Sequence, residues 1–91
     1  MRNTDPQTAQ ETLDRLKEAL DEKKRTRGED HPETFSAMRS LAIALLDMGQ
    51  NIEAIAILQE LHLRQKRVFG TKDPDTKDTE QLLGLLHSLR R

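Results

Sequence analysis

The chain contains GEDHPET at residues 28–34 and a related segment, GTKDPDT, at residues 70–76. The glycine, proline and threonine of the first segment each return after 42 residues in the second. The sequences ahead of the two segments also match at this spacing, with Leu16 and Leu58 as one such pair. Because separate parts of the chain share one period, the spacing predicts an internal repeat. Periods of about 20–50 residues are typical of arrays built from small repeated units.

Each repeated segment combines a signal that ends one helix with a signal that starts the next. Gly28 follows a basic stretch, and cations in the last turn of a helix offset the negative end of its dipole. A glycine just after the helix accepts the left-handed conformation that often ends it. Pro32 suits the first helical position, where its missing N–H would be unpaired anyway. His31, just before it, is predicted to be the N-cap. The second segment repeats these three roles with Gly70, Asp73 and Pro74.

Between these signals, apolar residues recur at spacings of three and four, which is the period of a helix rather than of a strand. The composition agrees, because only 2% of the residues are aromatic and the apolar ones are mainly good helix formers. Helices are predicted over residues 6–27, 32–48, 51–69 and 74–90. The break at residues 49–51 is short, so the helices on either side must be antiparallel. We therefore expect a single all-α domain over residues 1–91, with four antiparallel helices forming about two helix–turn–helix units.

Each predicted helix carries an apolar face that we expect to contribute to the core. In chain order the four faces comprise Ala9, Leu13, Leu16, Ala19 and Leu20; Phe35, Met38, Leu41, Ala42, Leu45 and Met48; Ala54, Ile55, Leu58, Leu61, Leu63, Val68 and Phe69; and Leu82, Leu83, Leu85, Leu86 and Leu89. The last helix has leucines on two arcs, 82/86/89 and 83/85, which exceed what one neighbouring helix can bury. Terminal repeats normally need a polar outer face, so we expect this helix to dock on a continuation of the array, a second copy or a partner.

Composition excludes several functional classes. The chain has 15 basic and 16 acidic residues and a net charge of −1, which gives no global preference for nucleic acid or anionic membranes. It has no cysteine, so disulfides, thiol nucleophiles and thiolate zinc sites are excluded. No stretch approaches the roughly 18 apolar residues of a membrane span. We expect a soluble, cytoplasmic protein without a membrane partner.

The sequence contains no motif that indicates catalysis or metal binding. The three histidines, His31, His62 and His87, do not pair at a spacing of four with another metal ligand, so their interpretation is structural. No phosphate-binding glycine loop and no nucleophile motif is present. The expectation is a protein that is not an enzyme and that has no catalytic residues, no metal and no cofactor.

The segment from Leu41 to Leu61 resembles the signature of the tetratricopeptide repeat. Ala42 and Ala54 occupy the positions where the signature has small residues at the contact between paired helices, and Gly49 occupies the turn. The ordinary repeat has about 34 residues, whereas the period here is 42. The additional residues fall in the long second helix and in the loop, and this extended form resembles the repeats of the kinesin light chain group.

The resemblance implies a protein–protein interaction module whose inner face, lined by the first helix of each pair, binds a peptide or helix of a partner. Carried onto this chain, the expected lining is Ser36, Arg39, Ile43, Leu46, Asp47, Asp78, Gln81, Leu85, Ser88 and Leu89. Two alternatives stay open. The leucine-rich last helix could form a homodimer, and the basic clusters at 23–27, 64–67 and 90–91 could bind nucleic acid or an acidic partner, although no stacking aromatics accompany them.

Overall fold

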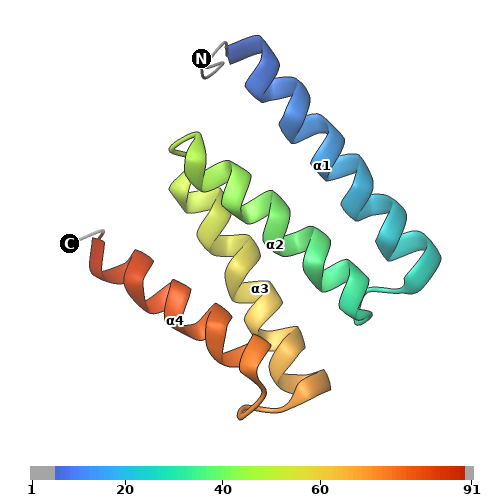
Figure 1. Ribbon diagram of the computed structural model, residues 1–91, viewed down its shortest axis with the longest axis vertical. Helices are drawn as coiled ribbons and strands as arrows, with labels where there is room; N and C mark the ends of the chain where they lie inside the picture. The colour runs from blue at the N-terminus through green and yellow to red at the C-terminus, as the bar shows by residue number, and fades with distance from the viewer. Residues whose placement is uncertain (1–5, 90–91) are drawn as a thin grey trace.

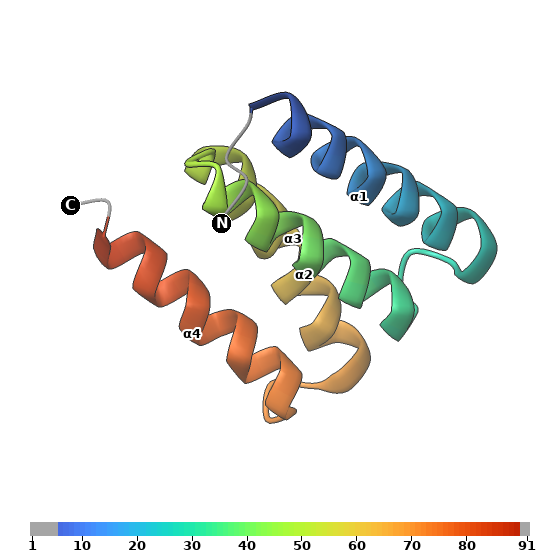
Figure 2. The same cartoon turned by 45° about the horizontal axis from the view of Figure 1, so that its top comes forward.

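A computed structural model describes residues 6–89, and the side chains of residues 8–88. These residues form the helices α1 (Pro6–Arg27), α2 (Pro32–Asp47), α3 (Asn51–Phe69) and α4 (Pro74–Leu89). Successive helices run antiparallel, and α1 and α4 lie on opposite sides of the α2–α3 pair (Figures 1 and 2). The packing follows the chain order, because α2 contacts α1 and α3, and α3 contacts α4. The predicted all-α fold of four antiparallel helices is confirmed.

The observed helix bounds differ from the predicted ones only at C-termini. Met48 is not the last residue of α2 but its C-cap, with φ −92° and ψ 2°. Gly49 follows with a φ of 79°, which turns the chain toward α3. The predicted last residue of the fourth helix, Arg90, lies outside the described residues. None of the described helices is long and apolar enough to cross a membrane.

The two loops that carry the repeat end their preceding helices in the same way. Gly28 has a φ of 95° and Gly70 a φ of 97°. Residues other than glycine rarely adopt positive φ angles. The N–H of Gly28 donates to the carbonyl of Lys24 at 3.1 Å, and the N–H of Gly70 donates to the carbonyl of Lys66 at 3.0 Å. The predicted stop signals therefore act through positive φ angles and an equivalent closing hydrogen bond.

The predicted N-caps are also present. His31 has an extended backbone, and its Nδ1 accepts a hydrogen bond from the N–H of Glu33 at 3.0 Å. Asp73 occupies the equivalent position, where its Oδ1 accepts from the N–H of Asp75 at 2.9 Å. In each case the side chain satisfies an N–H that has no partner within the first turn of a helix.

The apolar core is continuous across the four helices. Its buried members are Leu13, Leu20, Phe35, Met38, Leu41, Ala42, Leu45, Ala54, Ile55, Leu58, Leu61 and Leu83. Phe35 and Phe69 add an edge-to-face contact with ring centroids 5.6 Å apart, a favourable geometry for two aromatic rings. The core thus links α1 to α4 through the central pair.

Four residues predicted to belong to the core are exposed instead. Leu63 and Val68 expose 59% and 43% of their surface, Leu85 exposes 63%, and Ala19 is also exposed. The predicted arc of leucines 83 and 85 is divided, because Leu83 is buried. A helix that packs along one or two sides leaves the rest of its circumference in solvent, so apolar residues beyond the contact stripe stay uncovered.

Two equivalent threonines are buried but differ in hydrogen bonding. Thr34 is fully buried, and its hydroxyl donates to the carbonyl of Gly28 at 2.6 Å, which ties the start of α2 to the end of α1. Thr76, 42 residues later, is 2% exposed, and its hydroxyl has no hydrogen-bond partner among the described residues. The two repeats therefore share the residue but not its contact.

We expect Thr34→Val and Thr76→Val to have different effects. The first should lower the free energy of unfolding by about 1 kcal/mol, because it leaves the Gly28 carbonyl without its donor. The second should be neutral or stabilising, because it removes a buried hydroxyl that has no partner. Urea unfolding followed by circular dichroism measures both. Equal losses in the two variants would show that the hydroxyl of Thr34 is not the stabilising group.

Candidate functional site

A groove of about 290 Å³ lies between α2 and α4. Its lining comprises Pro32, Phe35, Ser36 and Arg39 from α2, Gln65 and Phe69 from α3, and Asp75 and Asp78 from α4. We call it the α2–α4 groove. Its position follows from the helix order, because α3 packs on both α2 and α4 and so holds the walls together.

Aromatic rings and one amide form the buried part of this groove. Phe35 is 3% exposed and contacts Phe69 edge to face. Gln65 is 5% exposed, and its Oε1 has no hydrogen-bond partner among the described residues. A buried polar atom without a partner is rare in folded proteins, because desolvation without a compensating hydrogen bond is unfavourable. The groove therefore contains an acceptor with unused hydrogen-bonding capacity beside apolar surface.

Charged side chains of opposite sign line the two walls. Arg39 lies on α2, whereas Asp75 and Asp78 lie on α4, one helical turn apart. All three residues are exposed, and within the described part of the chain their side chains take part in no hydrogen bond or ion pair. One wall is thus acidic and the other basic, with each charge available to a ligand.

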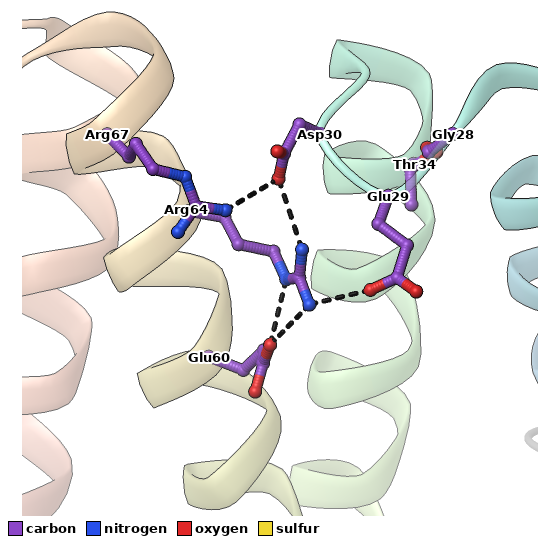
Figure 3. Close-up of polar contacts among 7 residues, drawn as sticks. All are labelled: Gly28, Glu29, Asp30, Thr34, Glu60, Arg64 and Arg67. Atoms are coloured by element: carbon purple, nitrogen blue, oxygen red, sulfur yellow. Dashed lines mark hydrogen bonds and ion pairs between the residues drawn. The ribbon is translucent and has the colours of Figure 1, made fainter.

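The charges at the loop between α1 and α2 are arranged differently, because they neutralise one another (Figure 3). Arg64 of α3 lies at the centre of this cluster, and its side chain is 19% exposed. Its guanidinium donates to Glu29 at 2.6 Å, to Asp30 at 3.1 Å and, from Nε, to Glu60 at 2.8 Å. Arg67 also donates to Asp30, at 3.0 Å. This Arg64 cluster ties the loop to a helix more than 30 residues later in the chain.

The pKa values of the cluster reflect these contacts. Burial acts to raise the pKa of Asp30, but the hydrogen bonds from Arg64 and Arg67 outweigh it and leave the pKa below its ordinary value. Burial acts to lower the pKa of Arg64, but hydrogen bonds to Glu60 and Asp30 outweigh it and raise the pKa. Each group is therefore held in its charged form.

We expect Arg64→Met to lower the free energy of unfolding by about 1 kcal/mol at neutral pH, because Glu29 and Glu60 would lose their cation and Asp30 would keep only Arg67. The loss should shrink as the pH falls through the lowered carboxyl pKa, since the protonated acids no longer need the guanidinium. Urea unfolding across pH measures both effects. Arg39→Met is the matched control and should have little effect on stability, because Arg39 forms no ion pair with another described residue. A loss for Arg64→Met that does not depend on pH would contradict the electrostatic explanation.

The predicted site residues separate into groups. Ser36, Arg39 and Asp78 line the α2–α4 groove. The remaining predicted positions lie elsewhere: Ile43, Gln81, Leu85 and Ser88 are exposed, Leu46 is partly buried against the core, and Asp47 lines a cleft with α1 residues. The side chain of Leu89 lies outside the described residues.

Sequence reasoning missed the buried members of the groove. The apolar pattern places Phe35 and Phe69 only in the core and predicts no role for Gln65. A signal for Gln65 existed, because it lies four residues after Leu61 and four before Phe69 and so falls on the buried stripe of α3. Asp75 likewise precedes Asp78 by three residues and shares its face of α4.

The basic clusters at the helix ends are partly compensated by acids. Lys23 donates to Glu33 at 2.7 Å, and Arg27 lies 3.6 Å from the same carboxylate. The hydrogen bond from Lys23 and the charge of Arg27 lower the pKa of Glu33. Arg64 and Arg67 are paired as described above, while the cluster at 90–91 lies outside the described residues. These pairs reduce the positive surface that a polyanion would require.

The comparisons with known proteins identify one family. The family model described as tetratricopeptide repeat matches residues 7–60, which is more than half of the 91-residue chain. The matched region covers α1, α2 and the first half of α3. No curated protein and no solved structure matches the chain.

Proposed function

Because the chain belongs to the tetratricopeptide repeat family, we propose that it is a scaffold that binds a peptide segment of a partner protein in the α2–α4 groove. Proteins of this family generally act as protein–protein interaction modules. The observation that carries the proposal is the groove itself. Its lining combines aromatic rings and an amide oxygen without a hydrogen-bond partner among the described residues. The charged side chains of its two walls form no ion pair with any described residue.

This combination suits a peptide better than a compact apolar ligand. Recognition of an extended segment needs apolar contacts for affinity and polar groups for specificity. Phe69 supplies partly exposed aromatic surface, while Arg39, Asp75 and Asp78 supply the polar groups. Exposed Ile43 on α2 and Leu85 on α4 extend the apolar surface along the same two helices. We infer that a bound segment runs between these helices.

We also infer that the 42-residue unit is the kinesin-light-chain-like variant of the repeat. The support comes from the loop, where Gly28 and Gly70 have the same backbone conformation and the same closing hydrogen bond. In the first loop, Glu29 and Asp30 form ion pairs with Arg64, which link this loop to α3, the second helix after it.

Selection of a random peptide library displayed on phage against the full chain would test the binding function. Selected peptides should perturb the NMR signals of groove residues. They should also bind at least about tenfold more weakly to Ser36→Trp, whose ring would fill the groove. Ala19→Trp on α1 is the control, because Ala19 is exposed but does not line the groove. Peptides that perturb residues elsewhere, or that bind the two variants equally, would contradict the proposal.

Self-association through α4 is the second candidate function. The observation that favours it is Leu85, which exposes 63% of its surface, beside the partly buried Leu82 and Leu86. Sedimentation velocity across a range of concentrations distinguishes the two functions. A mass that rises with concentration, and falls to the monomer in Leu85→Ser, would support a dimer formed by this helix. A monomer at every concentration would exclude it.

A further inference from the structure

We propose that the α2–α4 groove recognises an arginine side chain of the bound segment, with the guanidinium held by Asp75 and Asp78 and one N–H directed to the amide oxygen of Gln65. This inference rests on the proposed function and names the chemistry of its partner. It follows from three observations on the acceptors, the apolar surface and the distribution of charge.

The first observation is the set of acceptors. Asp75 and Asp78 are one turn apart on α4 and line the groove, and their side chains bond to no described residue. Gln65 contributes an Oε1 that is buried without a partner. A planar guanidinium carries five N–H donors in a fixed geometry and pairs well with carboxylates. An ammonium group is more strongly hydrated and acts as a point charge, so it suits this spread of acceptors less well.

The second observation is the apolar surface next to these acceptors. Phe69 is partly exposed and contacts Phe35, which is almost fully buried. The aliphatic stem of an arginine can lie on such rings while its head group stays polar. Guanidinium groups also stack on aromatic faces. The aromatic part of the groove therefore accommodates the aliphatic stem of the arginine, while the carboxylates of Asp75 and Asp78 bind its guanidinium.

The third observation is the contrast between the groove and the Arg64 cluster. At the loop, every acid in the cluster has a basic partner within 3.1 Å. In the groove, the acids have none among the described residues, although Arg39 lines the opposite wall. This separation of charge leaves the α4 wall ready for a cation and the α2 wall ready for an anion. A bound segment with an arginine toward α4 and an acidic residue toward Arg39 would match both.

NMR titration of the isotope-labelled chain with N-acetyl-arginine methylamide tests the inference directly. Saturable shifts are expected at the side-chain amide of Gln65 and at the backbone amides of Asp75 and Asp78, with a dissociation constant on the order of millimolar. The neutral citrulline analogue has nearly the same shape and should bind about tenfold more weakly. The lysine analogue should be intermediate.

Variants separate recognition from folding. Asp75→Asn with Asp78→Asn should weaken arginine binding about tenfold, whereas Asp47→Asn, on the α1 side of α2, should leave it unchanged. Gln65→Leu should also weaken binding. Because this variant keeps the buried volume and removes an unpartnered polar atom, its thermal stability should be equal or higher. A purely structural residue would not combine weaker binding with undiminished stability.

Several outcomes would overturn the inference. These are the absence of saturable shifts with the arginine compound, or equal binding of the arginine and citrulline compounds. Failure of the broader function looks different. If selected peptides occupy the groove without needing a basic residue, the inference is wrong and peptide binding stands. If no peptide occupies the groove, the proposed function itself fails.

Discussion

Leu58→Ala should lower the free energy of unfolding by about 3 kcal/mol, because it removes a large side chain from a site that is fully buried. Leu58 lies on α3, the helix that packs on both α2 and α4. A cavity at this point would lie inside the core. A chain of 91 residues is expected to have a total stability of only about 5–13 kcal/mol, so one substitution would remove a large share of it.

Leu63→Ala provides the matched control for this prediction. Leu63 lies on the same helix and undergoes the same change, but 59% of its surface is exposed. Leu63→Ala should change the free energy of unfolding by no more than about 0.5 kcal/mol. Urea unfolding followed by far-ultraviolet circular dichroism gives both values. Similar losses at the two positions would mean that leucine contributes through helix propensity rather than through burial, which would contradict the packing described for α3.

The contrast between these two leucines shows how far the sequence predicts the fold. Helix starts and stops depend on a few neighbouring residues, so Gly28, His31 and Pro32 marked the first loop correctly. Burial depends on which side of a helix meets a neighbour. The apolar spacing placed both Leu58 and Leu63 in the core, although only Leu58 faces it. Local pattern therefore predicted the elements better than their contacts.

The candidate site illustrates the same division. The family resemblance named Ser36, Arg39 and Asp78, which line one groove. It also named Asp47, which lies in a cleft on the α1 side of α2. A helix between two neighbours has two contact sides, and residue spacing alone does not say which side meets which helix.

Contacts between distant residues were least accessible from the sequence. The sequence presents Arg64 as one member of a basic helix end, but in the fold it pairs with acids 34 and 35 residues earlier in the chain. The polar residue Gln65 is almost completely buried for a related reason, since neighbouring helices cover the side of α3 on which it lies. Only the packed arrangement of helices reveals that one charge is neutralised and one amide is left without a partner.

Ala54→Leu should destabilise the fold by about 2 kcal/mol, by overpacking rather than by forming a cavity. Ala54 has no exposed surface and belongs to the core, and its small side chain leaves no room for the larger one without movement of the surrounding helices. The resemblance to the repeat signature gives the same reason, because this position is kept small where paired helices meet.

The matched control is Ala56→Leu on the same helix. Ala56 is exposed and lines a separate groove of about 360 Å³ that also includes Leu20 of α1. A larger side chain has space there, so the change in stability should stay within about 0.5 kcal/mol. Urea unfolding of both variants measures the difference. If Ala54→Leu were as stable as Ala56→Leu, the helix contact at position 54 would tolerate a large residue. The small size of Ala54 would then not determine how α3 packs. The expected difference instead makes the fully buried alanine a determinant of how closely the central helices approach, and hence of the groove that both helices line.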